Sequence, residues 1–405
     1  MAVNLAPPEN LLPVPGVRLG VAEAAIKRQG RKDLLLIELA AGSRVVGVFT
    51  RNAFCAAPVL LCRERADKDI RGLLINAGNA NAATGRGGLE DARITTAAAA
   101  QSLGGDDDSV LPFSTGVIGT RLPVGRMLSA IDAAAANLRA DGWQDAARAI
   151  MTTDTVPKGS SRQLQLSCGA TATITGIAKG VGMICPDMAT LLAFVGTDAR
   201  LTPVAVRRCL SDAVAVSFNS ITVDGDTSTN DSCVLFASAR SGAGDIDPDH
   251  VDYPAVAAAV TAVCLDLAQA MVRDGEGATK FIRIEVGGAR DVAEARQVGY
   301  SIAHSPLVKT ALFAGDANWG RIVMAIGKSG VAGLDPVGVS VALDDVTLIE
   351  RGEPHPDYRE ERGAAVVARA EFAIRVNLGR GPAAATLWTC DLSYDYVKIN
   401  AEYRT

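Results

Sequence analysis

The residues with the clearest chemical potential lie in one stretch, AKGVGMICPDMATLLAFVGTDA, which spans residues 178–199. Ala189 is followed there by Thr190, and an apolar run comes directly after that pair. A threonine hydroxyl beside a strained peptide can attack the preceding carbonyl, and water then hydrolyses the resulting ester. The new N-terminal threonine carries a free α-amine with a pKa of roughly 8, which can act as a general base. The pair therefore suggests self-cleavage between Ala189 and Thr190 and covalent catalysis by Thr190.

A second segment, PFSTGVIGTRLP at 112–123, holds hydroxyl side chains between glycines. We expect Ser114, Thr115 and Gly116 to form a turn there. Such a turn can aim a backbone N–H and a hydroxyl at a developing oxyanion. Taken alone, the segment is equally compatible with a simple loop.

The sequence offers few residues for the other common nucleophile systems, Ser-His-Asp and Cys-His. The three histidines, His250, His304 and His355, each stand alone, and the eight cysteines form no Cys-x-x-Cys pair. We therefore expect neither a metal centre nor a disulfide framework. Walker and G-x-G-x-x-G spacings are missing from the sequence, so GDANWGR at 315–321 is interpreted as a structural or site-lining turn and no cofactor is expected.

Composition restricts the class of partner. The net charge of −5 and the pI near 5.4 argue against nucleic acid or anionic lipid as the main ligand. The longest apolar run, roughly 253–265, is broken by Asp266 and is short for a membrane span. The start of the chain lacks the basic residues of a signal peptide. We expect a cytoplasmic protein.

Hydrophobic periodicity predicts a mixture of helices and strands. Helices are expected at 90–102, 123–138, 142–151, 202–216 and 253–273, with Thr202 as the N-cap and Pro203 at the first helical position of the fourth. Strands are expected at 33–39, 44–50, 59–62, 72–78, 162–167, 171–178, 191–196, 233–238, 281–286, 339–343 and 371–378. The 33–39 and 44–50 strands flank a turn, and the 162–167 and 171–178 strands flank Cys168-Gly169. This order favours α+β layers over a βαβ repeat.

A series of motifs covers nearly the whole chain from about residue 13. In chain order they are STGVIG, MTTDT, KGVGM, PDMATLLAF, DGDTSTND, DGEGATK, SPLVKTA, GDANWGR and CDLSYDYVKINAEYRT. Together they resemble the ornithine acetyltransferase family, also called glutamate N-acetyltransferase, which serves arginine biosynthesis.

The resemblance implies a fold and an assembly. The fold would be an αββα four-layer sandwich of the N-terminal-nucleophile type over 1–280. A smaller C-terminal α/β domain over 281–405 would follow, with its tail returning to the active site. Self-cleavage would give an α chain, 1–189, and a β chain, 190–405, which assemble as α2β2.

The resemblance also implies a reaction and its residues. Thr190 would take the acetyl group from N2-acetylornithine and pass it to glutamate in a ping-pong cycle, and a second activity with acetyl-CoA as donor is left open. Thr115 and Gly116 would form the oxyanion hole. The substrate would be held by Thr153, Lys179, Thr190, Glu276, Asn400 and Thr405. Glu276 can pair with the ornithine ammonium, and Lys179 and Asn400 offer donors to the carboxylate or acetyl group.

Departures from the family pattern and competing functions remain. Val181 stands where the family usually has serine, and Cys185 and Asp187 stand where it has alanine and asparagine; the added charge could alter the rate of self-cleavage. The alternative enzyme is an N-terminal-nucleophile aminopeptidase or amidase, which passes the acyl group to water. A non-enzymatic binding protein is the third class, and it would need no cleavage.

Overall fold

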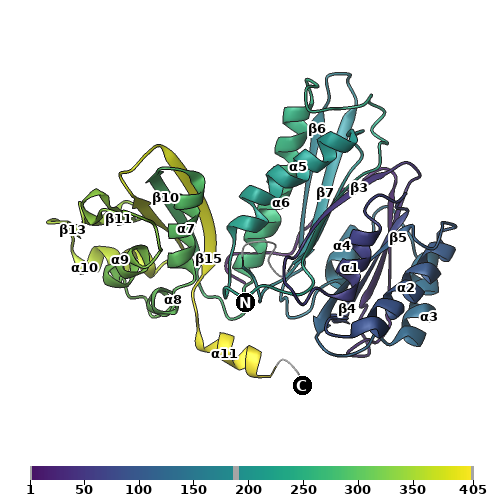
Figure 1. Ribbon diagram of the computed structural model, residues 1–405, viewed down its shortest axis with the longest axis horizontal. Helices are drawn as coiled ribbons and strands as arrows, with labels where there is room; N and C mark the ends of the chain where they lie inside the picture. The colour runs from purple at the N-terminus through teal and green to yellow at the C-terminus, as the bar shows by residue number, and fades with distance from the viewer. Residues whose placement is uncertain (1, 186–190, 403–405) are drawn as a thin grey trace. The chain divides into compact units, whose positions relative to one another are not determined.

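The computed structural model describes residues 2–185 and 191–402 of the chain (Figure 1). The chain divides into two compact units. The larger unit comprises Ala6–Asn219 and Asp226–Met271. The smaller unit comprises Met1–Leu5, Ser220–Gly225 and Val272–Thr405. Within the described residues there are three sheets, two in the larger unit and one in the smaller, so the expected mixed α+β class is confirmed.

The first sheet of the larger unit has the strand order β1-β2-β4-β5. The β1–β2 and β2–β4 pairs are antiparallel, whereas β4 and β5 run parallel because a helix, α2, connects them. The strands are β1 (Val17–Ala22), β2 (Leu34–Leu39), β4 (Gly72–Asn79) and β5 (Val110–Val117). The neighbouring helices are α1 (Ala57–Glu64), α2 (Gly85–Ser102), α3 (Val124–Ala136) and α4 (Trp143–Ala149).

The second sheet has the order β3-β9-β8-β7-β6. Its strands are β3 (Arg44–Phe49), β6 (Lys158–Gln165), β7 (Thr171–Lys179), β8 (Leu192–Thr197) and β9 (Ser232–Ala237). The expected hairpin around Cys168-Gly169 is confirmed, since β6 and β7 pair antiparallel and Gly169 has a positive φ of 85°. The helices that follow β8 and β9 are α5 (Pro203–Val216) and α6 (Tyr253–Arg273), and a 3-10 turn spans Phe218–Ser220.

The two sheets share an apolar core because successive strand residues point to opposite faces. In β2, Leu35 and Ile37 join a cluster with Phe194 and Phe236 of the second sheet. The intervening Leu34 and Leu36 lie in another cluster, with side chains of α2 and α3. Helix α2 packs against β4 and β5, and α3 packs against β1 and β2 of the same sheet (Figure 1). Helix α5 packs against β3 and β9 of the second sheet.

Helix α6 is the one described helix that is long and apolar enough to cross a membrane, by length and composition alone. A core helix of a soluble protein passes the same test. Val260, Val263 and Leu267 are buried, and a side chain on Gly176 of β7 would meet the latter two. These contacts identify α6 as a helix that packs on the second sheet.

The smaller unit is built on a six-stranded sheet of order β13-β12-β11-β14-β10-β15. Its strands are β10 (Phe281–Ala289), β11 (Ser340–Leu343), β12 (Val346–Glu350), β13 (Glu353–Pro354), β14 (Glu371–Asn377) and β15 (Ala383–Cys390). Its helices are α7 (Val292–Ala303), α8 (Pro306–Phe313), α9 (Trp319–Gly327), α10 (Glu360–Val367) and α11 (Tyr394–Ala401), and a second 3-10 turn spans Pro336–Gly338. One apolar cluster joins this sheet to α7, α8, α9 and α10. The GDANWGR turn leads into α9, where Asn318 Oδ1 accepts from the Arg321 N–H at 3.1 Å.

Two distant segments complete the smaller unit. Val3 N–H donates to the Arg273 carbonyl at 2.7 Å. Thr222 N–H donates to the Trp388 carbonyl at 3.0 Å, beside a bridge between Ile221 and Trp388. The unit is therefore discontinuous in sequence.

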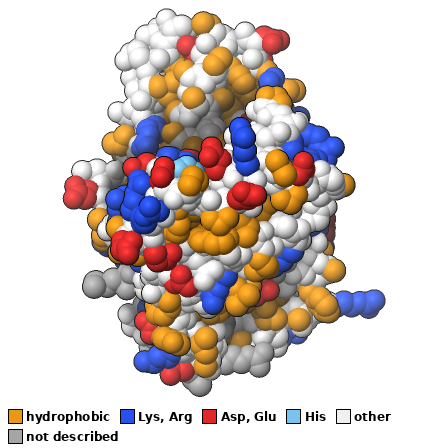
Figure 2. Space-filling view, turned by 90° about the vertical axis from the view of Figure 1, so that its left-hand side faces the viewer, with side chains coloured by type: hydrophobic (Ala, Val, Ile, Leu, Met, Phe, Trp, Pro, Cys, Tyr) orange, Lys and Arg blue, Asp and Glu red, His pale blue; other side chains and the backbone are white. Residues whose placement is uncertain are grey.

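Charged side chains of opposite sign lie close together on the surface. Figure 2 shows a face on which Lys and Arg stand beside Asp and Glu, with apolar side chains between them. In the smaller unit, Glu285 pairs with Arg283 at 2.7 Å and with Arg375 at 2.8 Å.

One predicted element is wrong. The apolar run 59–62 was expected to be a strand, but it lies inside α1. Four apolar residues are too few to separate a strand from a helix by periodicity. Pro58 at the helix start and the burial of Val59, Leu61 and Cys62 on one side are compatible with the helix.

Candidate active site

Thr115 and Gly116 lie at the end of β5 and not in a turn, which corrects the expectation for this segment. The parallel register with β4 places Thr115 opposite Ala77 and Gly116 opposite Gly78, and it shifts at Asn79. Gly116 has a φ of +136°, and a Cβ there would lie 2.2 Å from the Gly78 carbonyl carbon. Only glycine fits this close approach of two backbones.

Lys179 ends β7 and reaches Thr115. Its Nζ donates to Thr115 Oγ1 at 3.2 Å, and both side chains are buried. An ammonium has donors only, so the hydroxyl oxygen accepts this bond. The hydroxyl proton is then directed away from the lysine and is available for another acceptor.

Asp154 is a buried carboxylate that the sequence reasoning did not single out, although it lies within the MTTDT motif. Its Oδ1 accepts from Lys158 Nζ at 2.8 Å and from Gly180 N–H at 2.9 Å, and its Oδ2 accepts from Thr152 N–H at 3.0 Å. Burial alone would raise the pKa of Asp154, but the charges of Lys158 and Lys179, together with the hydrogen bonds from Gly180 N–H and Lys158, outweigh it and hold the pKa well below its ordinary value. Asp154 therefore stays ionised.

Asp154 also connects two segments that carry predicted site residues. Thr153 precedes it in the chain and is partly buried, and Gly180 follows Lys179. The bond from Gly180 N–H thus ties the 151–155 segment to the end of β7. A carboxylate within an otherwise uncharged motif was the signal that could have identified this residue.

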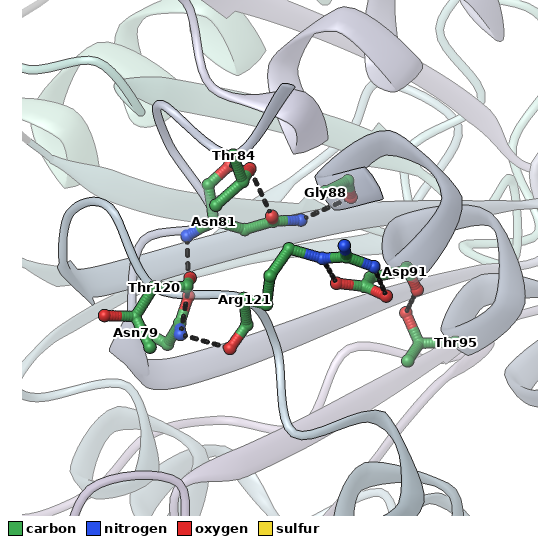
Figure 3. Close-up of polar contacts among 8 residues, drawn as sticks. All are labelled: Asn79, Asn81, Thr84, Gly88, Asp91, Thr95, Thr120 and Arg121. Carbon is green, nitrogen blue, oxygen red and sulfur yellow. Dashed lines mark hydrogen bonds and ion pairs between the residues drawn. The ribbon is translucent and has the colours of Figure 1, made fainter. Parts of the chain in front are cut away.

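A network of asparagines shapes the loop after β4 (Figure 3). Asn79 Nδ2 donates to the carbonyls of Thr120 and Arg121 at 3.0 and 3.1 Å, and its Oδ1 accepts from Asn81 N–H at 2.7 Å. Asn81 Nδ2 in turn donates to the Gly88 carbonyl at 2.8 Å. Because Asn79 is the point where the β4–β5 register shifts, these bonds hold the backbone against which Gly116 packs.

The same network is closed by an ion pair visible in Figure 3. Arg121 Nη2 donates to Asp91 Oδ1 at 2.7 Å, and Thr84 Oγ1 donates to Asn81 Oδ1 at 2.8 Å. The run NAGNANAATG at 76–85, dense in asparagine and small residues, was the sequence signal for this loop.

Glu276 and Asn400 meet within the smaller unit. Asn400 Nδ2 donates to Glu276 Oε2 at 2.9 Å; Glu276 is buried and Asn400 exposed. The DGEGATK loop is held by the C-terminal segment, since Ser393 Oγ donates to the Gly277 carbonyl at 2.6 Å and Asp391 Oδ1 accepts from Thr279 N–H at 2.8 Å. Two motifs more than a hundred residues apart therefore form one local structure.

Some of the predicted site residues lie close together in the structure, and others lie outside the described residues. Thr115, Gly116 and Lys179 lie together in the larger unit, with Thr153 linked to them through Asp154. Glu276 and Asn400 lie together in the smaller unit. Ala189, Thr190, Asp187 and Thr405 lie outside the described residues. Val181 is buried, as suits an apolar side chain.

Comparisons with known proteins identify the family. The chain matches the ArgJ family over residues 18–405. It is 55% identical over 395 residues to the arginine biosynthesis bifunctional protein ArgJ of Methylococcus capsulatus, which covers 98% of this chain and 97% of that protein. It is 52% identical over 406 residues to the protein of the same name from Pseudomonas syringae pv. tomato, with both chains covered completely.

A solved structure agrees with these relatives. The crystal structure of ArgJ from Bacillus halodurans is 43% identical, with a TM-score of 0.50, and the match covers 52% of this chain and 98% of that chain. The prediction of a glutamate N-acetyltransferase of arginine biosynthesis is confirmed, and the aminopeptidase or amidase alternative is not supported. This protein belongs to the ArgJ family.

Proposed function

We propose that this enzyme is a glutamate N-acetyltransferase that moves the acetyl group of N2-acetylornithine to glutamate through an acetyl ester on Thr190. The observation that carries the proposal is the contact between Lys179 Nζ and Thr115 Oγ1, next to a glycine whose backbone geometry admits no side chain. A hydroxyl whose proton points away from an ammonium is suited to donate to a developing oxyanion. In a chain of the ArgJ family, that arrangement fits acyl transfer.

The proposed reaction begins with self-cleavage. The Thr190 hydroxyl oxygen adds to the Ala189 carbonyl carbon, the Ala189–Thr190 C–N bond breaks, and the nitrogen leaves protonated as an α-amine. Water hydrolyses the ester, which yields the Ala189 carboxylate and restores the hydroxyl. The α-amine then serves as the base that histidine supplies in other enzymes.

Acetyl transfer follows the same chemistry twice. The Thr190 hydroxyl attacks the acetyl carbonyl of N2-acetylornithine, and ornithine leaves after its nitrogen takes the proton held by the α-amine. The amine of glutamate next attacks the acetyl ester, and the Thr190 oxygen leaves with a proton. We assign Thr115 and Gly116 to the oxyanion hole of both steps.

The proposed substrate contacts are chosen by complementary charge. Glu276 would pair with the ornithine ammonium, with Asn400 orienting its carboxylate through the 2.9 Å bond. Thr153, Lys179, Thr190 and Thr405 complete the proposed set. N2-acetylornithine is proposed as the main donor and acetyl-CoA as a poor one.

The finer fold and assembly belong to the same proposal. The core shared by the two sheets of the larger unit, with α2 and α3 beyond one sheet and α6 beyond the other, supports an αββα sandwich. The Bacillus halodurans match supports division into two chains, since nearly all of that solved chain corresponds to about half of this one. We propose chains 1–189 and 190–405, an α2β2 assembly and a cytoplasmic location.

Intact-mass analysis combined with a transfer assay tests the function. The purified enzyme should give fragments 1–189 and 190–405, and N2-acetylornithine without glutamate should add one acetyl group to the second. Thr190→Ala should remain one inactive chain, and Thr115→Ala should lower kcat by about 100- to 1,000-fold. An acetyl label on a cysteine or lysine, or an active enzyme that is never cleaved, would contradict the proposal.

Replacing the donor tests its identity. Acetyl-CoA and glutamate are supplied without N2-acetylornithine, and acetylglutamate is measured directly. A rate far below that with N2-acetylornithine is expected. A comparable rate would make acetyl-CoA a full second donor.

A further inference from the structure

Asn230 and Asp231 form a buried pair of neighbours directly before β9. They belong to the DGDTSTND motif, for which neither the sequence nor the family resemblance supplied a role. Their side chains bind two different parts of the larger unit. The two parts are the end of β5, which carries Thr115, and the start of β8, which follows Thr190 in the sequence.

Asn230 holds the strand that carries the proposed oxyanion hole. Its Nδ2 donates to the Ser114 carbonyl at 2.9 Å and to the Ala80 carbonyl at 2.6 Å. Ser114 directly precedes Thr115, and Ala80 directly follows the point where the β4–β5 register shifts. Both N–H protons of the Asn230 amide are therefore donated to backbone carbonyls around Thr115 and Gly116.

Asp231 holds the first residue of the described chain after the proposed nucleophile. Its Oδ1 accepts from Leu191 N–H at 3.0 Å, and the parallel β8–β9 register begins at the next residue pair, Leu192 and Ser232. The antiparallel β7–β8 register sets Lys179 opposite Leu192 on the other side. The start of β8 is thus fixed from both neighbouring strands.

The backbone of the pair is itself anchored. Asp231 carbonyl accepts from Thr50 N–H at 2.9 Å, and Asn230 N–H donates to Ser228 Oγ at 3.1 Å. Thr229 Oγ1 donates to Asn230 Oδ1 at 2.6 Å, which fixes the orientation of the amide. The backbone of the pair and the Asn230 amide cannot shift without breaking these bonds.

We propose that Asn230 and Asp231 are positioning residues for acetyl transfer, which set the oxyanion-hole strand and the nucleophile strand relative to each other. The inference rests on the proposed function. Its physical basis is that covalent catalysis needs the nucleophile and the oxyanion donors in one fixed geometry, and a displacement of about 1 Å can cost about 100-fold in rate. Two adjacent residues give the shortest covalent link between the two groups.

Isosteric exchanges at the two positions should have opposite results. Asn230→Asp removes both amide donors and should lower kcat by about 10- to 100-fold, as should Asn230→Ala, with KM little changed. Asp231→Asn keeps an oxygen that accepts from Leu191 N–H and should retain most of the activity, whereas Asp231→Ala should not. Activity is measured on the full chain with N2-acetylornithine and glutamate, and intact mass reports the cleaved fraction.

Asp198 supplies the matched control. It is buried at the other end of β8, and its Oδ1 accepts from Thr173 N–H at 2.7 Å, so Asp198→Ala removes a bond of the same kind. Asp198→Ala should lower the free energy of unfolding about as much as Asp231→Ala does, and it should leave kcat within about twofold of the wild-type value. A loss of kcat in Asp198→Ala equal to that in Asp231→Ala would overturn positioning, as would full activity of Asn230→Ala, or an Asp231→Asn enzyme as impaired as Asp231→Ala.

Amide hydrogen exchange tests the positioning role of Asn230 and Asp231 even if the wild type transfers no acetyl group. Asn230→Ala should speed exchange in peptides from the end of β5, and Asp231→Ala should speed it at Leu191, relative to Asp198→Ala. Unchanged exchange would reject the positioning role. An inactive, uncleaved wild type with the expected exchange pattern would instead reject the proposed function alone.

Discussion

Three buried aspartates in the larger unit show how neighbours decide the charge of a residue. Burial is the largest influence on Asp154, Asp198 and Asp231, and in each it raises the pKa. Only Asp154 has a lysine ammonium in direct contact, and only there does the pKa fall. Burial keeps the pKa of Asp231 well above its ordinary value although Leu191 N–H and the charge of Lys179 both lower it. The nearest cation therefore determines which carboxyl is ionised.

Asp154→Asn should destabilise the protein at neutral pH. The exchange breaks the ion pair between Asp154 and Lys158, whose side chain is fully buried, and breaking a buried pair costs about 3–5 kcal/mol. A lowered folded pKa gives stability that is present above the ordinary value of 3.8 and is lost as pH falls through the folded pKa. The deficit of the variant should thus be full at pH 7 and shrink below about pH 4.

Urea unfolding at pH 7 and at pH 3 measures this difference. Asp212→Asn is the control, because Asp212 and its partner Arg208 are both exposed and such pairs contribute about 0–1 kcal/mol. A deficit that does not depend on pH would show that Asp154 acts through packing and not through its charge.

Gly116→Ala should abolish acetyl transfer. A Cβ would stand 2.2 Å from the Gly78 carbonyl carbon and 2.5 Å from the Asn79 nitrogen, so the strands must separate at the proposed oxyanion hole. Gly119→Ala controls for the positive φ, since Gly119 has a φ of +88° and open space around its Cβ position. Turnover is compared for both variants after circular dichroism confirms folding; equal losses would mean that backbone strain, and not the contact with β4, is responsible.

Small residues determine how closely helices approach the second sheet. Gly176 of β7 leaves room for Val263 and Leu267 of α6, and a Cβ there would lie 2.8 Å from Val263 Cγ1 and 3.0 Å from Leu267 Cδ1. β7 ends at Lys179, so the seating of α6 is coupled through one strand to the candidate site. Close packing of this kind is one use of the many glycine and alanine residues in the sequence.

Gly176→Ala should lower the free energy of unfolding by about 1–3 kcal/mol, because it overpacks the interface between α6 and β7. Val263→Ala in the same chain should recover part of that loss, since it removes the methyl groups that the new Cβ meets. A double-mutant cycle by urea unfolding measures the coupling. Strictly additive losses would show that the two residues do not compete for space.

At the scale of the whole chain, the two sides of the proposed cleavage point are interleaved in one sheet. β3 and β7 precede residue 189, whereas β8 and β9 follow residue 190. β7 pairs with β8, and β3 pairs with β9. Cleavage would therefore cut the chain without dividing the sheet.

Fragments 1–189 and 190–405 should consequently co-purify under native conditions. Backbone hydrogen bonds on both sides of the β8–β9 pair connect them, so they should separate only when the fold unfolds. Size-exclusion chromatography across a urea series, with the uncleaved Thr190→Ala chain alongside, provides the measurement. Fragments that elute apart without denaturant would exclude this arrangement of the cleaved enzyme.

Local signals in the sequence determined several elements and the family. Thr202 was expected to cap a helix with Pro203 at its first position, and the Thr202 hydroxyl accepts from Ala205 N–H at 3.3 Å. The turn at Cys168-Gly169 and the motifs that identified the ArgJ family are likewise readable within a few residues. Caps, turns and motifs act over such short distances, which is why one chain segment suffices to predict them.

Only the tertiary structure decided which distant segments meet. Nothing near Asn230 indicates that its amide binds the Ser114 carbonyl, 116 positions away, or that Asp154 ties its segment to Gly180. The same holds for Thr115 and Gly116, which belong to a strand because β4 lies beside them, and for residues 220–225, which join the smaller unit through Trp388. These contacts depend on strand pairing and burial across the whole chain, and a short window of sequence contains neither.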